Sequence, residues 1–191
     1  MKNEIEARYL ECDVESVIQK LEANNAKFIG DWLQKRYCYD FNPVKTNSWI
    51  RLRTNGKETT LTIKEIQDKT ISGTKELEIV VSDFNLTDEM LNKLGYTARS
   101  KQENRRIRYM LDDVEIDIDF WPMIPSYLEF EAESEQQIID VCKKLEIDYK
   151  ELVTLDVSSI YEKYGINFNV IPEVKLEDDR KNQKYNYEKE Y

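Results

Sequence analysis

Three charged side chains stand at every second position in the stretch "EIEARYL" near the start of the chain. Glu4, Glu6 and Arg8 alternate there with apolar residues. Because successive side chains of a strand point to opposite faces, a strand here would place two carboxylates and a guanidinium on one face. Such a face either meets water or holds a ligand that offers partners to both signs of charge.

The same alternation recurs in most of the strands that the sequence predicts. Its charged or polar members are Arg51 and Arg53; Thr60, Thr62 and Lys64; Glu76 and Glu78; Arg106 and Arg108; Glu115, Asp117 and Asp119; and Glu129 and Glu131. Apolar residues occupy the positions between them, so each strand has one apolar face and one charged face. Three of the acidic pairs, at 4–6, 76–78 and 129–131, run directly into an amphipathic helix pattern.

Strands joined by short turns must position these residues. Strand patterns cover 4–10, 31–41, 48–55, 58–66, 74–83, 103–111, 114–120 and 126–133. Asn55-Gly56 is a strong hairpin signal. Helices are predicted after a cap at Asp13, from a cap at Thr87 to Gly95, from a capping box at Ser134, and briefly over 158–165. This order predicts an α+β fold with a large antiparallel sheet.

Length and composition favour one domain. We expect residues 1–168 to form it, followed by a polar tail over 169–191 whose mixed charge and lack of periodicity favour disorder. No apolar run approaches the roughly 20 residues that a membrane span needs. Three scattered cysteines and no histidine argue against a zinc site or a disulfide framework, so a cytoplasmic protein is expected.

Charge restricts the partners and the chemistry. A net charge of −10 argues against nucleic acid, whose binding proteins usually present a basic surface. The absence of histidine removes the usual proton shuttle at neutral pH, so a general base would have to be a carboxylate, a lysine or a group activated by a metal. An anionic ligand would need a local basic cluster inside an acidic protein.

Acidic pairs are weak signals when taken singly. With 38 Asp and Glu among 191 residues, roughly seven pairs at this spacing arise by chance, and an antiparallel sheet often has a solvated polar face. Taken together they indicate more, because helices cover the apolar faces and a long sheet with one charged face can close into a barrel. Carboxylate pairs hold Mg²⁺ or Mn²⁺, and arginines bind phosphate oxygens. A polyphosphate with its metals needs both.

The order of these motifs resembles the CYTH superfamily of triphosphate tunnel metalloenzymes. E-x-E-x-basic, R-x-R, a single strand lysine, E-x-E, a second basic strand, D-x-D and a final E-x-E follow one another over roughly residues 1–168. The superfamily includes class IV adenylyl cyclases, thiamine triphosphatases and inorganic tripolyphosphatases. The resemblance implies an eight-stranded antiparallel β-barrel with flanking helices, and a tunnel for ATP, thiamine triphosphate or tripolyphosphate.

The resemblance also implies roles for particular residues. The triphosphate would contact Arg8, Arg51, Arg53, Lys64, Arg106 and Arg108, of which Arg8 and Lys64 are the catalytic candidates. Mg²⁺ or Mn²⁺ would bind to Glu4, Glu6, Glu129 and Glu131 with Asp117 or Asp119, while Glu76 and Glu78 would have a supporting role. Relatives are often homodimers, so the resemblance gives a homodimer as one candidate state of this chain.

One position departs from the family pattern, which has lysine where this chain has Arg8. Arginine binds phosphate but stays protonated and cannot act as a base, so the nucleophile would depend on the metal for its activation. Attack by water would make a triphosphatase, and attack by a ribose hydroxyl would make cyclic AMP. A non-catalytic polyphosphate or nucleotide binder, and a structural domain with a solvated charged sheet, are the alternatives.

Overall fold

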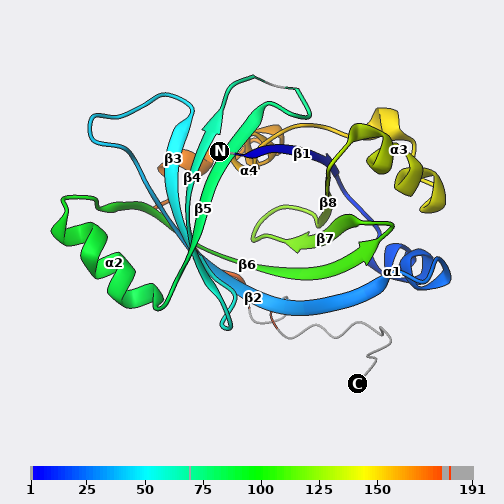
Figure 1. The fold of residues 1–191 in the computed structure, drawn as a ribbon, viewed down its shortest axis with the longest axis horizontal. Coiled ribbons are helices and arrows are strands. Elements are labelled where there is room, and N and C mark those ends of the chain that lie inside the picture. Colours follow the sequence, from blue (N-terminus) through cyan, green and yellow to red (C-terminus); the bar gives the residue numbers. More distant parts are fainter. Residues whose placement is uncertain (1, 69, 178–180, 182–191) are drawn as a thin grey trace.

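Eight antiparallel strands form a strongly curled, barrel-like sheet in the computed structural model, which describes residues 2–68, 70–177 and 181 (Figure 1). The pairing order is β2-β3-β4-β5-β1-β8-β7-β6, and β6 pairs again with β2, so the pairings close a ring. The strands are β1 (Lys2–Tyr9), β2 (Lys27–Tyr39), β3 (Ser48–Thr54), β4 (Thr59–Ile66), β5 (Thr74–Val81), β6 (Ala98–Leu111), β7 (Val114–Phe120) and β8 (Tyr127–Ala132). The expected α+β fold with an eight-stranded antiparallel sheet is confirmed.

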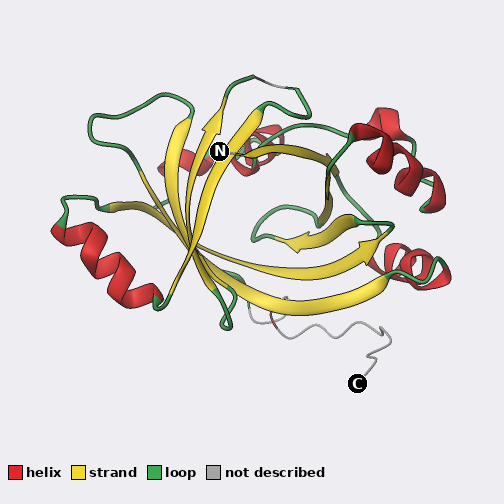
Figure 2. Ribbon diagram, viewed as in Figure 1, coloured by secondary structure: helices red, strands yellow, loops and turns green. Residues whose placement is uncertain are grey.

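Four α-helices lie outside the sheet, as Figure 2 shows. They are α1 (Val14–Ala23), α2 (Phe84–Lys93), α3 (Glu135–Lys144) and α4 (Val157–Lys163), with short 3-10 turns η1 (Tyr149–Glu151) and η2 (Phe168–Val170). Buried residues of α1 and α3, such as Leu21 and Ile138, pack with apolar residues of β6, β7 and β8. The helices therefore cover the apolar faces of the strands and leave the charged faces to the interior of the barrel.

Side chains of Asp or Ser begin each α-helix. Asp13 and Ser134 cap α1 and α3 as predicted, and Asp156 caps α4. The predicted cap of α2 at Thr87 is wrong, because a carboxylate earlier in the chain already accepts the first free N–H groups. Asp83 Oδ1 accepts from the N–H of Leu86 at 2.7 Å, while the Thr87 hydroxyl donates to the Asp83 carbonyl within the helix.

Strands β2 and β6 are longer than their sequence patterns predict. They pair continuously from Lys27 opposite Met110 to Tyr39 opposite Ala98, with two register shifts. The predicted hairpin between β3 and β4 is present, with Thr54 opposite Thr59 and four residues between them. The long β2–β6 ladder joins the two ends of the sheet and so closes the ring.

Packed structure continues past residue 168. The short strand β9 (Glu173–Val174) pairs in parallel with β6, and Val174 and Leu176 are buried. The first part of the expected tail therefore adds a short strand to the sheet beside β6, whereas residues 178–180 and 182–191 lie outside the described part. Within the described residues no helix is long and apolar enough to cross a membrane.

Candidate functional site

The inward faces of the strands enclose a cavity of about 830 Å³. Its lining contains eight Lys or Arg side chains and five Asp or Glu side chains among the described residues. The cations are Arg8, Arg36, Lys45, Arg51, Arg53, Lys64, Arg99 and Arg106, and the acids are Glu6, Asp40, Asp68, Glu129 and Asp156. A chain with a net charge of −10 thus carries an excess of positive charge in its cavity.

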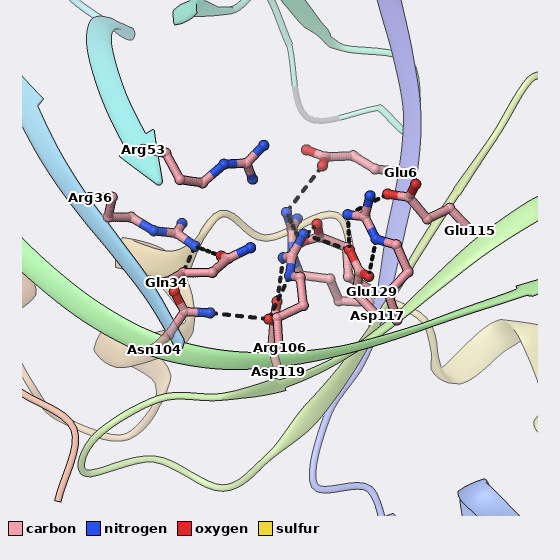
Figure 3. Close-up of polar contacts among 12 residues, drawn as sticks. Glu6, Gln34, Arg36, Arg53, Asn104, Arg106, Glu115, Asp117, Asp119 and Glu129 are labelled. Carbon is pink, nitrogen blue, oxygen red and sulfur yellow. Dashed lines mark hydrogen bonds and ion pairs between the residues drawn. The ribbon is translucent and has the colours of Figure 1, made fainter. Parts of the chain in front are cut away.

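Sheet register brings the tightest ion pairs together around Arg106, which lies directly across from Asp119 on β7 (Figure 3). Arg106 Nε donates to Asp119 Oδ1 at 2.8 Å, and its Nη2 lies 3.1 Å from Glu129 Oε1. Asp117 contacts the same guanidinium through Nη1. Although burial opposes the charged form, these carboxylates raise the pKa of Arg106 well above its ordinary value.

Arg8 lies across from Glu129 in the β1–β8 pair and is held on three sides. Its Nε donates to Glu129 Oε2 at 2.8 Å, its Nη2 to Glu6 Oε2 at 3.1 Å and its Nη1 to the carbonyl of Leu155 at 2.7 Å. Burial works against its charge, but Glu129 and Glu6 outweigh burial and raise its pKa. Arg8 is therefore a permanently charged group that three acceptors hold in this structure.

Lys64 on β4 keeps one short ion pair, whereas the two arginines of β3 lie farther from their carboxylates. Lys64 Nζ lies 2.7 Å from Glu76 Oε1 and 3.7 Å from Glu6 Oε1. Arg51 Nη2 lies 3.5 Å from the nearest oxygens of Glu76 and Glu78, and Arg53 Nη2 lies 3.8 Å from Glu78 Oε2. The cations of β3 are consequently less neutralised by carboxylates than Arg8 and Arg106 are.

A row of three glutamates crosses β1, β8 and β7. Glu6 pairs in register with Glu131, and Glu131 pairs with Glu115. Burial, together with the charges of Glu129 and Glu6, raises the pKa of Glu131, and burial with the charge of Asp117 raises the pKa of Glu115 to about 7. Like charges directly across a sheet are destabilising, so this row would be stabilised by a cation.

The sequence-predicted residues fall into four groups. Glu6, Arg8, Arg51, Arg53, Lys64, Arg106 and Glu129 line the cavity. Asp117, Asp119, Glu76 and Glu78 contact those cations, and Glu131 lies in the glutamate row. Arg108 pairs with Asp117 and Glu115 and does not line the cavity. The side chain of Glu4 lies outside the described part.

Sequence reasoning missed two residues of this region. Arg36 lines the cavity from β2, and Glu115 occupies the glutamate row. The signal for Arg36 was its alternation with Gln34 and Cys38, three residues that are buried inside the barrel. The alternation places Glu115 on the charged face of its strand, but the family resemblance implies Asp117 or Asp119 as the metal ligand there.

The donor set fits a hard divalent cation in kind, since carboxylate oxygens are what Mg²⁺ and Mn²⁺ prefer and the glutamate row concentrates negative charge. Among the described residues, however, no three acidic or cysteine side chains are arranged to hold a metal. Glu6, Asp117, Asp119 and Glu129 instead contact arginine or lysine. Metal binding would thus require these carboxylates to exchange partners.

A barrel-like antiparallel sheet around a cavity lined by both signs of charge places the chain among α+β proteins with a charged internal cavity. The sequence profile of the CYTH domain matches residues 3–164, so the chain belongs to the CYTH domain family. A search of curated proteins finds no match.

Two solved structures illustrate the shared fold. The PH1012 protein of Pyrococcus horikoshii OT3 is 24% identical, with a TM-score of 0.70 over 82% of this chain and 98% of that one. HpAC1 from Hippeastrum, named as a candidate adenylyl cyclase and described as having a dominant triphosphatase activity, is 14% identical. Its TM-score is 0.62 over 90% of this chain and 100% of that one. At these identities the likeness shows the fold.

Proposed function

We propose that this protein hydrolyses a triphosphate inside the cavity with the help of Mg²⁺ or Mn²⁺. The observation that carries the proposal is the lining itself: eight cations and five acids in a cavity of about 830 Å³, within an acidic chain. A cationic lining attracts polyanions, and the adjacent glutamates supply oxygen ligands for a cation that accompanies them. A solvated structural sheet would not need this enclosed excess of positive charge.

In this proposal the ion pairs of the cavity exchange partners when substrate enters. Arg8, Arg51, Arg53, Lys64 and Arg106 would turn toward phosphate oxygens, which releases Glu6, Glu129 and the two aspartates from their present pairs. Glu6, Glu129 and Glu131, with Asp117 or Asp119, would hold the metal. When bound, the metal would neutralise phosphate charge and activate the attacking group.

Arg8 and Lys64 would stabilise charge rather than accept protons. Arg8 stays protonated because its neighbouring carboxylates raise its pKa. Lys64 is tied to Glu76 at 2.7 Å in a buried position and can follow the phosphate as charge develops in the transition state. Both residues would lower the barrier electrostatically, by stabilising negative charge on the phosphoryl oxygens.

The scarcity of exposed aromatic rings in the described cavity lining favours hydrolysis over cyclisation of ATP. Trp49, Tyr127 and Phe168 are the aromatic residues of the cavity among those described, and Tyr127 and Phe168 are buried. Only Trp49 offers a partly exposed ring on which a nucleobase could stack. We therefore rank an inorganic or small organic triphosphate ahead of ATP.

The three cysteines are free and two are buried, which suits a reducing cytoplasm.

The test is to incubate the protein with tripolyphosphate, thiamine triphosphate or ATP, with Mg²⁺, Mn²⁺ or EDTA, and to follow the products by phosphorus NMR. We expect metal-dependent release of orthophosphate, fastest from a substrate without a nucleobase. Formation of cyclic AMP and pyrophosphate from ATP would refute hydrolysis and support the cyclase alternative. If none of the three substrates is converted with either metal, the enzymatic proposal fails.

A further inference from the structure

Arg36 is a buried cation held entirely by neutral groups. It is 6% exposed, and its Nη2 donates to Gln34 Oε1 and to Asn104 Oδ1, each at 2.8 Å (Figure 3). No carboxylate within the described part of the chain forms an ion pair with it, and its buried Nε has no hydrogen-bond partner there. Arg36 therefore lines the cavity with a charge that no carboxylate pairs and with one buried N–H that has no partner among the described residues.

The surroundings of Arg36 fix its position without cancelling its charge. Its guanidinium carbon lies 4.6 Å from the centre of the buried Trp121 ring, which supports one face. Asn104 is oriented in turn, because its amide nitrogen donates to Asp119 Oδ1 at 3.2 Å. Buried charges in proteins are ordinarily paired, since desolvating a lone charge is costly. A fixed, unneutralised guanidinium is the arrangement expected where a ligand supplies the anion.

A second cation faces the same space. Arg53 lies directly across from Arg36 in the β2–β3 pair, where like charges oppose each other. The contact of Arg53 with the carboxylate of Glu78 is 3.8 Å long. Burial and the charges of Arg51 and Arg106 lower the pKa of Arg36 to about 10.

Few carboxylates neutralise these two cations. In Figure 3, Arg36 and Arg53 stand on the opposite side of Arg106 from Glu115, whereas the carboxylate of Glu6 extends toward Arg53. Glu6 forms its ion pairs with Arg8 and Lys64. A phosphate beside Arg36 and Arg53 would therefore meet two cations whose charge is weakly neutralised.

We propose that Arg36 and Arg53 form a phosphate subsite that binds one end of a polyphosphate independently of any metal. Arg36, outside the motifs that relate the chain to its family, would be a further substrate-binding residue, with its guanidinium and that of Arg53 donating to the phosphate. The inference rests on the proposed function in that it names how the triphosphate is oriented. The terminal phosphate, which carries the most charge, occupies this subsite.

The experiment measures binding of tripolyphosphate by titration calorimetry in EDTA, so that no metal contributes. Arg36→Gln is expected to weaken binding at least tenfold, and Arg36→Lys less, since an ammonium keeps the charge but loses the planar fork of donors. The matched control is Lys101→Gln, which removes one exposed charge from the same barrel. It should bind within about twofold of the wild type. Unchanged affinity in a folded Arg36→Gln variant would overturn the proposal.

Thermal unfolding of the ligand-free variants in EDTA separates a binding role from a structural one. Removing an unneutralised buried cation should leave the Tm of Arg36→Gln equal to or above that of the wild type. A large fall in Tm, or failure to fold, would assign Arg36 to the fold and overturn the subsite. Arg36-dependent binding without turnover in metal would refute the proposed hydrolysis and leave the subsite standing. Metal-dependent turnover that is equal in Arg36→Gln and the wild type would refute the subsite and leave the proposed hydrolysis standing.

Discussion

Arg8 illustrates how one side chain constrains the chemistry of the cavity. Its guanidinium is used by Glu6, Glu129 and the carbonyl of Leu155, and its backbone N–H donates to the carbonyl of Val153 at 2.8 Å. It thereby fastens the segment before α4 to β1 while its pKa lies above the ordinary value. A permanently charged residue of this kind can orient carboxylates and phosphates, but it cannot relay a proton.

Glu115 should make the stability of the metal-free protein depend on pH. Its pKa is raised in the fold from 4.5 to about 7 by burial and by the charges of Asp117 and Glu131. A carboxyl group whose pKa is raised in the fold contributes its full stabilisation at pH values below its unfolded pKa of 4.5. This contribution declines as pH rises above 4.5 and is lost above about 7. The loss is at most about 3 to 4 kcal/mol, at roughly 1.4 kcal/mol per pH unit.

The variant Glu115→Gln should therefore unfold at a higher temperature than the wild type at pH 8 in EDTA, and at nearly the same temperature at pH 4. Differential scanning calorimetry across this range measures the effect, with the exposed Glu58→Gln as a control that should show no such trend. A Tm difference that does not change with pH would contradict the account of the glutamate row.

At the scale of elements, the sequence predicts faces better than it predicts partners. Period-two alternation located the charged faces of β3, β4, β7 and β8, and Asp13 and Ser134 marked two helix starts, because these signals lie within a few residues. The closure of the ring rests on the β2–β6 ladder, whose partners are distant in sequence and show no local pattern. For the same reason, the neighbours of Arg36 and the opposition of Glu115 to Glu131 could not be predicted, since both depend on register.

The start of α2 offers a test at this scale. Asp83→Ala removes the side chain that accepts from the N–H of Leu86, so we expect the free energy of unfolding to fall by about 1 kcal/mol. Thr87→Ala removes only a hydroxyl that donates to a carbonyl inside the helix and should cost less. Urea denaturation measures both variants. A larger loss for Thr87→Ala would restore Thr87 as the cap that its sequence pattern suggested.

At the scale of the whole molecule, charge is segregated between the cavity and the rest of the protein. The chain carries a net charge of −10, yet cations outnumber acids in the lining of the cavity. A polyanion approaching the protein meets an unfavourable overall field and a favourable local one, so an accompanying divalent cation helps it to enter. In the proposed function the internal ion pairs would serve as exchangeable partners, which keep carboxylates and arginines neutralised until a metal and a phosphate chain take their places.

In the proposed function one cavity holds both the metal and the triphosphate. A crystal structure with tripolyphosphate and Mn²⁺, using the anomalous signal of manganese, tests this most directly. We predict a manganese peak beside Glu6, Glu129 and Glu131, and phosphate density against Arg36 and Arg53. Manganese and phosphate bound only on the outer surface, with the pairs of Arg8 and Arg106 unchanged, would contradict it.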